Sequence, residues 1–289
     1  MNGSSSTAVN GSSSTAVGGG LFAADSVTWQ VHRDPAMILG GLRALFLQAL
    51  HPAAMRGVAQ NSDFRADPWG RLMRTAEFVG VTTYGTEANA RKTAARIRGI
   101  HRKLRALDPQ TGVSYRIDSP DLLLWVHCAE IDSYLSVTRR AGLRLSAADA
   151  DRYVLEQVTS AELIGVPADD PRIPRSVRDL DRYFQWLRPD LALTQEALAA
   201  ARFLLSPPMP TWVRLGTPAA PAWAGLASLG FALLPRWARR IYALPGLPTT
   251  DLGAAAITTA LRMAVLAVPP RFRDGPHYKA ALARTTPAA

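Results

Sequence analysis

Helix start signals recur along this chain, and they constrain its fold more than any other feature. Asp34, Asp67 and Ser119 each stand immediately before a proline, so a capping side chain precedes a residue suited to the first helical position. Ser146 opens a segment that resembles a capping box. Sustained period-two alternation with hairpin turns does not appear. The sequence therefore predicts an all-α fold.

The helix signals and the apolar periodicity between them divide the chain into segments. We expect helices over 35–50, 68–84, 87–106, 120–140, 146–164, 176–186, 194–204, 224–233 and 251–267. Residues 2–9 and 10–17 repeat one octapeptide, and three glycines follow. Such sequence buries too little apolar surface to offset its ordering entropy. We therefore predict a disordered low-complexity tail over 1–20 and a single multi-helix domain over 21–289.

The net charge of +10 comes almost wholly from arginine, because only three of the 33 basic residues are lysines. Arginine binds carboxylates and phosphates in a bidentate manner, so this balance suits an acidic ligand, an anionic membrane surface or nucleic acid. A coding bias that replaces lysine with arginine explains the composition more simply. Aromatic–basic interleaving and a helix-turn-helix pattern are absent from the sequence, so nucleic acid is not an expected partner.

Cys128 is the only cysteine, which excludes an intrachain disulfide and a cysteine-based zinc site. Nothing in the sequence requires an oxidising compartment, and we expect a cytoplasmic protein.

Residues 215–235 carry no charge, but their prolines leave a helix shorter than the roughly twenty apolar residues that a membrane span needs. We predict no transmembrane span, and a buried or surface-lying segment compatible with peripheral membrane contact.

Five histidines are candidates for chemistry. His32 and His277 lie near the chain ends among loop residues, and we expect both at the surface. His51 follows an apolar helical run; it either interacts with a helix C-terminal dipole or lies in a pocket near bound oxygen or substrate, as donor or proton carrier. His127 lies inside an apolar helical run, where a hydrogen-bonded core residue and a ligand are both open interpretations.

His101 lies in an arginine-rich helical segment. Helical spacing places Ile97, Arg98, Leu104 and Arg105 on its face. One imidazole framed by apolar groups and two guanidiniums is what a haem edge requires: nitrogen for iron, hydrocarbon for the ring and cations for the propionates. A basic helix with one histidine is also typical of a solvated face.

Arg71 and Thr75 are four residues apart on the helix that Asp67 caps, so they share a face, and Arg74 lies on an adjoining one. A guanidinium and a hydroxyl directed into one cavity would polarise an oxygen-bound intermediate. The alternative is a surface ion pair and an ordinary helix-interior threonine.

Several motifs in sequence order carry a resemblance to a known family. The chain contains His51-Pro52-Ala53-Ala54-Met55, then Asp67-Pro68-Trp69-Gly70-Arg71-Leu72-Met73-Arg74-Thr75, then Tyr84-Gly85-Thr86, Ile97-Arg98-Gly99-Ile100-His101 and Asp118-Ser119-Pro120-Asp121-Leu122-Leu123-Leu124-Trp125-Val126-His127. Over roughly 26–280 the sequence resembles the MpaB and latex-clearing (rubber oxygenase) family, also called DUF2236.

That resemblance implies an all-α fold that binds haem b between helices through a proximal histidine. His101 matches the iron ligand, Arg71 and Thr75 match haem-pocket residues, and Arg74 falls where latex-clearing proteins place a lysine able to approach the iron. Arginine cannot deprotonate at working pH, so Arg74 is a poor iron ligand. With Arg98, Arg105 and His127 it is counted here among the cofactor-binding residues.

The catalytic glutamate of latex-clearing proteins has no evident counterpart upstream of Arg71, where Asn61, Ser62 and Asp63 stand. Rubber cleavage is therefore not the expected reaction, and His51 is the nearest candidate for a distal acid–base group. The resemblance implies an oxygenase that uses haem b and dioxygen on an apolar alkene, terpenoid or lipid-like substrate.

Two alternatives stay open at this point. The first is a haem- or lipid-binding carrier or sensor without turnover. The second is a non-haem metal enzyme that uses His51, His101 and His127 as ligands.

Overall fold

A computed structural model describes residues 19–62 and 67–285. The N-terminal half contains α1 (Val27–Arg33), α2 (Met37–Gln48), α3 (Pro52–Asn61), α4 (Pro68–Tyr84), α5 (Glu87–His101), β1 (Arg105–Leu107), β2 (Ser114–Arg116) and α6 (Pro120–Arg140). Next come α7 (Ala147–Glu156), α8 (Val158–Ile164), α9 (Val177–Leu187), the 3-10 helix η1 (Arg188–Asp190) and α10 (Gln195–Leu205). The chain continues with α11 (Thr211–Gly216), α12 (Ala219–Ala232), α13 (Arg236–Ile241), α14 (Pro248–Leu266), α15 (Pro270–Arg273) and α16 (Pro276–Thr285). The all-α fold class is confirmed.

Most predicted helices are present, and the capping signals explain their starts. α4 and α6 begin and end at the predicted residues. Asp67 accepts a hydrogen bond from Gly70 N at the start of α4, and Ser146 forms the expected capping box with Asp149. The segment predicted as one helix over 146–164 is instead two, α7 and α8, divided at Gln157. The predicted tail falls largely on 1–18, outside the described residues.

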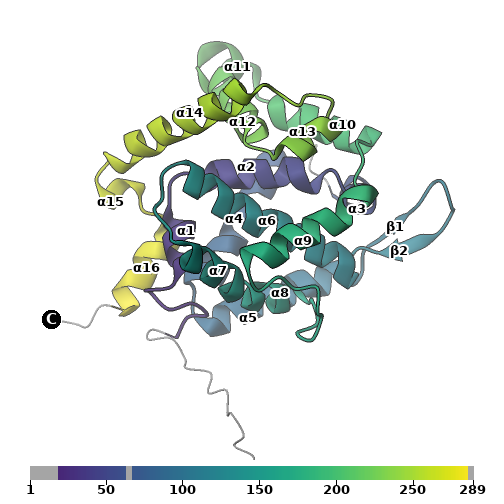
Figure 1. The fold of residues 1–289 in the computed structure, drawn as a ribbon, viewed down its shortest axis with the longest axis horizontal. Helices are drawn as coiled ribbons and strands as arrows, with labels where there is room; N and C mark the ends of the chain where they lie inside the picture. The colour runs from purple at the N-terminus through teal and green to yellow at the C-terminus, as the bar shows by residue number, and fades with distance from the viewer. Residues whose placement is uncertain (1–18, 63–66, 286–289) are drawn as a thin grey trace, which may run out of the picture.

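The helix predicted over 87–106 is wrong at its end. α5 stops at His101, and Arg105 begins a short antiparallel hairpin in which it pairs with Arg116. Local turn chemistry accounts for the difference, because the Asp108 carboxylate accepts from Gln110 N and Gly112 adopts a positive φ of 69°. Arg105 is therefore not on the helical face of His101. The hairpin projects from the helices in Figure 1.

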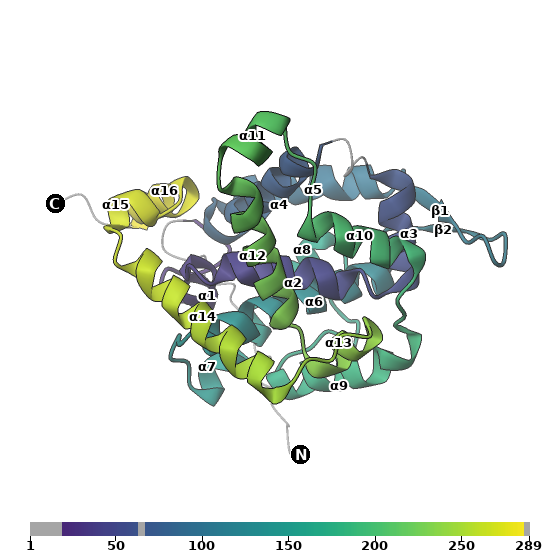
Figure 2. The same cartoon turned by 90° about the horizontal axis from the view of Figure 1, so that it is seen from above.

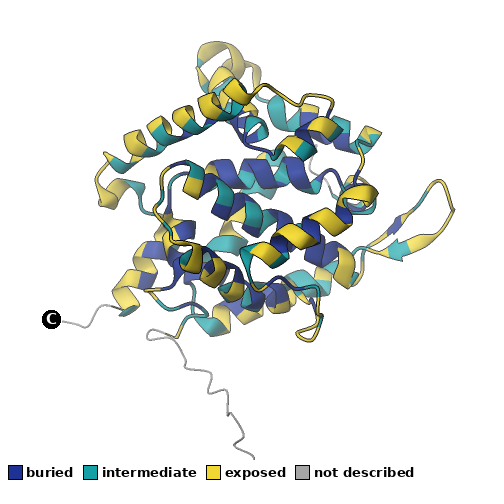
Figure 3. Ribbon diagram, in the orientation of Figure 1, coloured by how far each residue is buried: buried dark blue, intermediate teal, exposed yellow. Residues whose placement is uncertain are grey.

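The longest buried helix, α6, packs against α2 at the centre of the molecule, as Figure 1 and Figure 2 show. Gly40 of α2 allows this close approach, since a Cβ there would lie 3.2 Å from Ser133 O and from the ring of Tyr134. Phe46, Leu124 and Trp125 are fully buried between these helices and their neighbours. Figure 3 shows the buried surfaces concentrated on α2 and α6.

The C-terminal helices cover one side of this core. α12 packs across α2, and α14 lies on α12 with much of its surface exposed (Figure 2, Figure 3). α12 begins at Ala219, earlier than the predicted 224, because Pro218 and Pro221 lie in the N-terminal turn, where proline is tolerated. The sequence did not predict six helices that the structure contains, namely α1, α3, α11, α13, α15 and α16.

Among the described helices, no single one is long and apolar enough to cross a membrane. α2 and α3 pass the length and composition test only as a pair, and the chain bends by 102° between them.

Candidate active site

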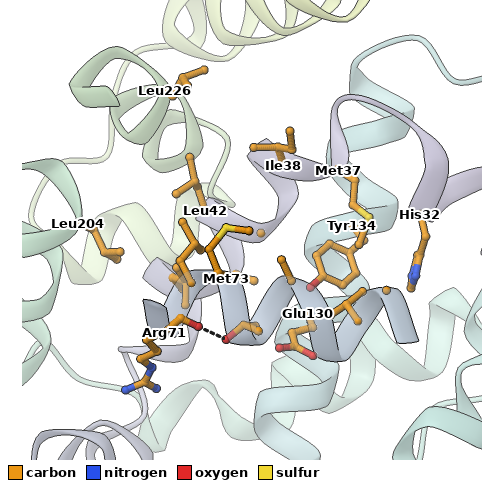
Figure 4. Close-up of a pocket in the computed structure, with 18 of the residues that line it drawn as sticks. His32, Met37, Ile38, Leu42, Arg71, Met73, Glu130, Tyr134, Leu204 and Leu226 are labelled. Atoms are coloured by element: carbon orange, nitrogen blue, oxygen red, sulfur yellow. Dashed lines mark hydrogen bonds between the residues drawn. The ribbon is translucent and has the colours of Figure 1, made fainter. Parts of the chain in front are cut away.

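A large cavity of about 730 Å³ lies between α2, α4 and α6 and is covered by α10 and α12. Its walls are mostly apolar and include Met37, Ile38, Leu42, Met73, Leu204 and Leu226, which Figure 4 labels. Cavities of about 300–1,000 Å³ with apolar walls and a few polar groups are typical of small-molecule sites. The polar side chains in this wall therefore mark where chemistry is available.

Arg71 and Thr75 both line the cavity from α4, so the structure brings this predicted pair together. The Thr75 hydroxyl donates to the Arg71 carbonyl at 3.1 Å, drawn as the dashed line in Figure 4. The Arg71 guanidinium donates to the Ser62 hydroxyl. Burial, together with the nearby charge of Arg74, lowers the pKa of Arg71, although arginine stays protonated at working pH. Arg71 thus presents a fixed cation to a mostly apolar space.

Arg74 is directed elsewhere. Its guanidinium pairs with the Asp67 carboxylate at 3.0 Å, and 69% of its side chain is exposed. Arg74 does not line the cavity in the described part of the chain. The structure therefore places Arg74 at the N-terminus of α4, beside the residue that caps this helix.

His51 is not at a helix C-terminus, and that expectation is corrected. α2 ends at Gln48, and His51 is the N-cap of α3, where its Nδ1 accepts from Ala54 N at 3.3 Å. Pro52 at the first position of α3 explains the start of the new helix. Burial lowers the pKa of His51, while Asp190 opposes the shift. The ring lies against Trp125, with centroids 5.8 Å apart.

His101 is the last residue of α5 and is half-buried. Burial lowers its pKa; Asp118 raises it and the Arg71 charge lowers it further. The imidazole therefore lies within electrostatic range of Arg71, although His101 is not among the described residues that line the cavity. Within the described chain, no side chain or backbone group hydrogen-bonds to its ring. A neutral imidazole without a partner is the form that ligates metals.

The two arginines expected beside His101 have other positions. Arg98 donates to the Leu163 carbonyl in the last turn of α8, and its aliphatic stem packs against Gly165, which has a φ of 108°. Arg105 is exposed on β1. Neither lines the cavity in the described structure. Arg98 therefore caps α8 and holds it to α5.

His127 is buried in α6, where only 4% of it is exposed, and burial lowers its pKa to about 4. It is not part of the cavity wall in the described structure. Over residues 19–62 and 67–285, no group of three or more His, Cys, Asp or Glu side chains is arranged to hold a metal ion. His51, His101 and His127 thus do not meet as the cluster that the non-haem alternative requires.

His32 lines the cavity, so the expectation that it lies at the surface is wrong. Its Nδ1 lies 2.8 Å from the Thr83 hydroxyl and its Nε2 lies 3.1 Å from the Tyr153 hydroxyl. Burial lowers the pKa of His32 to about 3. The missed signal was Ser26, which caps α1 and makes His32 part of a packed helix. His277 is half-buried at the cavity and bonds to Glu77 at 2.8 Å.

Glu130 and Tyr134 also line the cavity and were not predicted as site residues. They are four residues apart on α6, so they share a face. Burial raises the pKa of Glu130 to about 7, although the Gln48 amide lowers it. An acidic residue within the apolar run of α6 was the available signal. In Figure 4, Glu130, Tyr134 and His32 lie to the right and Arg71 to the left.

Comparison with known proteins places this architecture in a family. Residues 29–268 match the family described as ER-bound oxygenase mpaB/B'/Rubber oxygenase, catalytic domain. The match covers most of the chain and includes α2, α4, α5 and α6, which surround or adjoin the cavity. No curated protein and no solved structure gave a significant match.

Proposed function

This chain belongs to the MpaB and rubber oxygenase catalytic-domain family, and we propose that it is a haem b-dependent oxygenase that acts on an apolar substrate. The family is one of oxygenases, so an oxidoreductase activity that consumes dioxygen follows from membership. We propose three finer features: haem b as the cofactor, an alkene, terpenoid or lipid-like substrate, and His101 as the iron ligand.

The cavity supports the substrate class. Its volume of about 730 Å³ and its apolar walls suit a ligand of drug size or larger whose surface is mostly hydrocarbon. Burial of such a ligand stabilises the complex by about 25 cal/mol per Å² of apolar surface removed from water. The cavity is therefore the observation that carries the proposal of an apolar substrate.

The residues beside the cavity fit a haem. His101 has a lowered pKa, so its imidazole is neutral at working pH and offers a free nitrogen to iron. Arg71 lies within electrostatic range of that imidazole and lines the cavity, where its cation would pair with an anionic group of the cofactor. His101 does not line the cavity itself, so its proposed role rests on its nearness to Arg71.

When bound, a haem supplies the iron chemistry that activates dioxygen. The chain would supply the polar groups and the apolar walls around the reacting atoms. Arg71 and Thr75 present a cation and a hydroxyl to the cavity from one face of α4, where negative charge that develops on oxygen would be stabilised. A bound apolar substrate would displace water from this space, which would strengthen these interactions. Whether the substrate is cleaved, epoxidised or dehydrogenated depends on the cofactor chemistry.

Peripheral contact with an anionic membrane is part of the proposal. Large apolar side chains are exposed over α11, α14 and α15, namely Trp212, Leu215, Leu252, Ile257, Met263 and Phe272. Arg214 and Arg271 lie among them, and the net charge of the chain is +10. Exposed apolar residues flanked by cations are typical of a surface that lies on anionic lipid. Val265 of α14 lines the cavity, so this surface adjoins the cavity wall.

A spectrum tests the proposed cofactor. The protein is purified after expression with ample haem and measured oxidised and then reduced with dithionite. We expect Soret absorbance in the wild type, loss of it in His101→Ala, and retention in the matched control His277→Ala, whose ring bonds to Glu77. An unchanged spectrum in His101→Ala, or no Soret band in the wild type, contradicts the proposal. Bound haem without oxygen consumption on apolar alkenes would indicate a carrier.

A further inference from the structure

The side chain of Tyr134 places a phenol in the wall of the cavity. Tyr134 is only 7% exposed and lines the cavity from α6. Buried tyrosine hydroxyls usually find a hydrogen-bond partner. Among the described residues, no group hydrogen-bonds to the Tyr134 hydroxyl. Its position in a mostly apolar cavity wall leaves this hydroxyl available to a ligand.

Glu130 provides a second polar group on the same face of α6. No cation forms an ion pair with it among the described residues, and its pKa is raised to about 7 by burial. The two groups are close enough that the Glu130 charge raises the pKa of Tyr134. Near neutral pH the carboxyl is present in both its protonated and its ionised form.

The surroundings hold the pair in place: the Gln48 amide hydrogen-bonds to the Glu130 carboxyl, which keeps further capacity for a ligand. The His32 ring packs against the Tyr134 ring with centroids 5.4 Å apart. Both nitrogens of His32 are already engaged, one by Thr83 and one by Tyr153, so His32 orients the phenol and is not available to a ligand. Met37 and Val126 add apolar wall nearby.

We propose that Glu130 and Tyr134 form a subsite that binds the hydroxyl group of an apolar alcohol. The inference rests on the proposed function, because it specifies the substrate class as a long hydrocarbon with one terminal hydroxyl. Arg71 lies apart from this pair, to the left in Figure 4, so an alcohol held here would extend its hydrocarbon through the apolar part of the cavity.

Hydrogen-bond chemistry favours an alcohol over related ligands. A hydroxyl is both donor and acceptor, so it can donate to an ionised Glu130 or accept from a protonated one while it accepts from Tyr134. An ammonium group only donates and a ketone only accepts. A carboxylate would place a second negative charge beside Glu130, which is unfavourable in an apolar cavity. The alcohol alone is satisfied in both protonation states of Glu130.

Binding of four twelve-carbon probes to the full chain tests the subsite. We expect 1-dodecanol to bind about tenfold more tightly than dodecane, the effect of roughly one to two net hydrogen bonds. Tyr134→Phe and Glu130→Leu should each remove most of this preference and leave dodecane binding unchanged, whereas Glu130→Gln should retain it. Thermal unfolding of each variant confirms that it is folded.

Tyr84→Phe is the matched control, because Tyr84 also lines the cavity and its buried hydroxyl has no partner in the described structure. It should leave the preference for dodecanol unchanged. Equal binding of dodecanol and dodecane by the wild type overturns the inference, as does loss of the preference in Tyr84→Phe but not in Tyr134→Phe. Tighter binding of dodecylamine or dodecanoate overturns it in favour of an amine or an acid.

The same titrations are made on haem-loaded and haem-free protein. A missing Soret band would contradict the proposed cofactor and leave the alcohol preference measurable. A haem-loaded protein without the preference would overturn the subsite alone.

Discussion

The guanidinium of Arg43 in α2 donates to the carboxylate of Asp132 in α6 at 2.7 Å, in the centre of the molecule. The same side chain donates to the Ser133 hydroxyl at 2.6 Å and to the Leu233 carbonyl at 3.0 Å. Only 3% of the Arg43 side chain is exposed. One cation therefore joins α2, α6 and the end of α12, the elements that support the cavity.

Removal of this cation should destabilise the fold. Arg43→Met leaves the Asp132 carboxylate without its partner, and breaking a buried pair costs about 3–5 kcal/mol. Arg91→Met is the control, since Arg91 and Glu87 form an exposed pair on α5 that contributes less than about 1 kcal/mol. Urea unfolding measures both. Equal stability of the two variants would contradict a structural role for Arg43.

Acid should destabilise the protein through His127. Its folded pKa of about 4 lies below the unfolded value of about 6.5, so the stability it contributes is complete above pH 6.5 and is lost as the pH falls toward 4. Each pKa unit corresponds to about 1.4 kcal/mol, which gives a loss of about 3 kcal/mol. His127→Leu should show a shallower decline in urea unfolding between pH 7 and 4. A decline in His127→Leu as steep as that of the wild type would exclude His127 as the cause.

Substitution of Arg71 should lower activity, whereas substitution of Arg98 should lower stability. Arg71→Met removes the cation at the cavity wall, and we expect oxygen consumption with an apolar alkene to fall about a hundredfold with the fold intact. Arg98→Met removes the bond to the Leu163 carbonyl, so we expect a loss of about 1–2 kcal/mol in stability with haem content retained. Oxygen uptake, Soret absorbance and urea unfolding distinguish the two. Loss of haem in Arg98→Met would instead restore Arg98 as a cofactor-binding residue.

The exposed apolar surface should bind anionic lipid. We expect the protein to sediment with phosphatidylglycerol vesicles at low salt, and less so at high salt or with neutral lipid. A double change, Leu252→Gln with Ile257→Gln, should weaken this binding at least several-fold, since each residue is more than half exposed on α14. Leu155→Gln on α7 is the control, because Leu155 is 49% exposed outside that surface. Unchanged binding by the double variant would remove α14 from the interface.

The start signals along the chain predicted the helices because they act locally. Asp67 and Ser146 cap α4 and α7 through side-chain bonds to residues three positions later, an interaction that the sequence spacing determines. The pairing of Arg71 and Thr75 on one face of α4 followed from the same spacing. These features depend on a few adjacent residues, so the sequence was sufficient.

The site residues that the sequence misplaced depend on distant contacts. His32 is held by Thr83 and Tyr153, whose positions come from other helices. Arg105 left the predicted helix because the hairpin pairs it with Arg116. Glu130 became a cavity residue only through the packing of α6 against α2. Helical periodicity does not contain such information, which explains why the polar pair on α6 was not predicted.

Gly40 has a consequence for how readily this cavity changes shape. Because nothing but a hydrogen separates the α2 backbone from the Tyr134 ring, any larger residue there would displace the phenol or push the two helices apart. The residue at position 40 therefore affects which ligands fit beside Tyr134, although Gly40 itself does not line the cavity in the described structure. Homologues that carry alanine at this place would be expected to accept a differently shaped molecule without any change in the side chains that contact it.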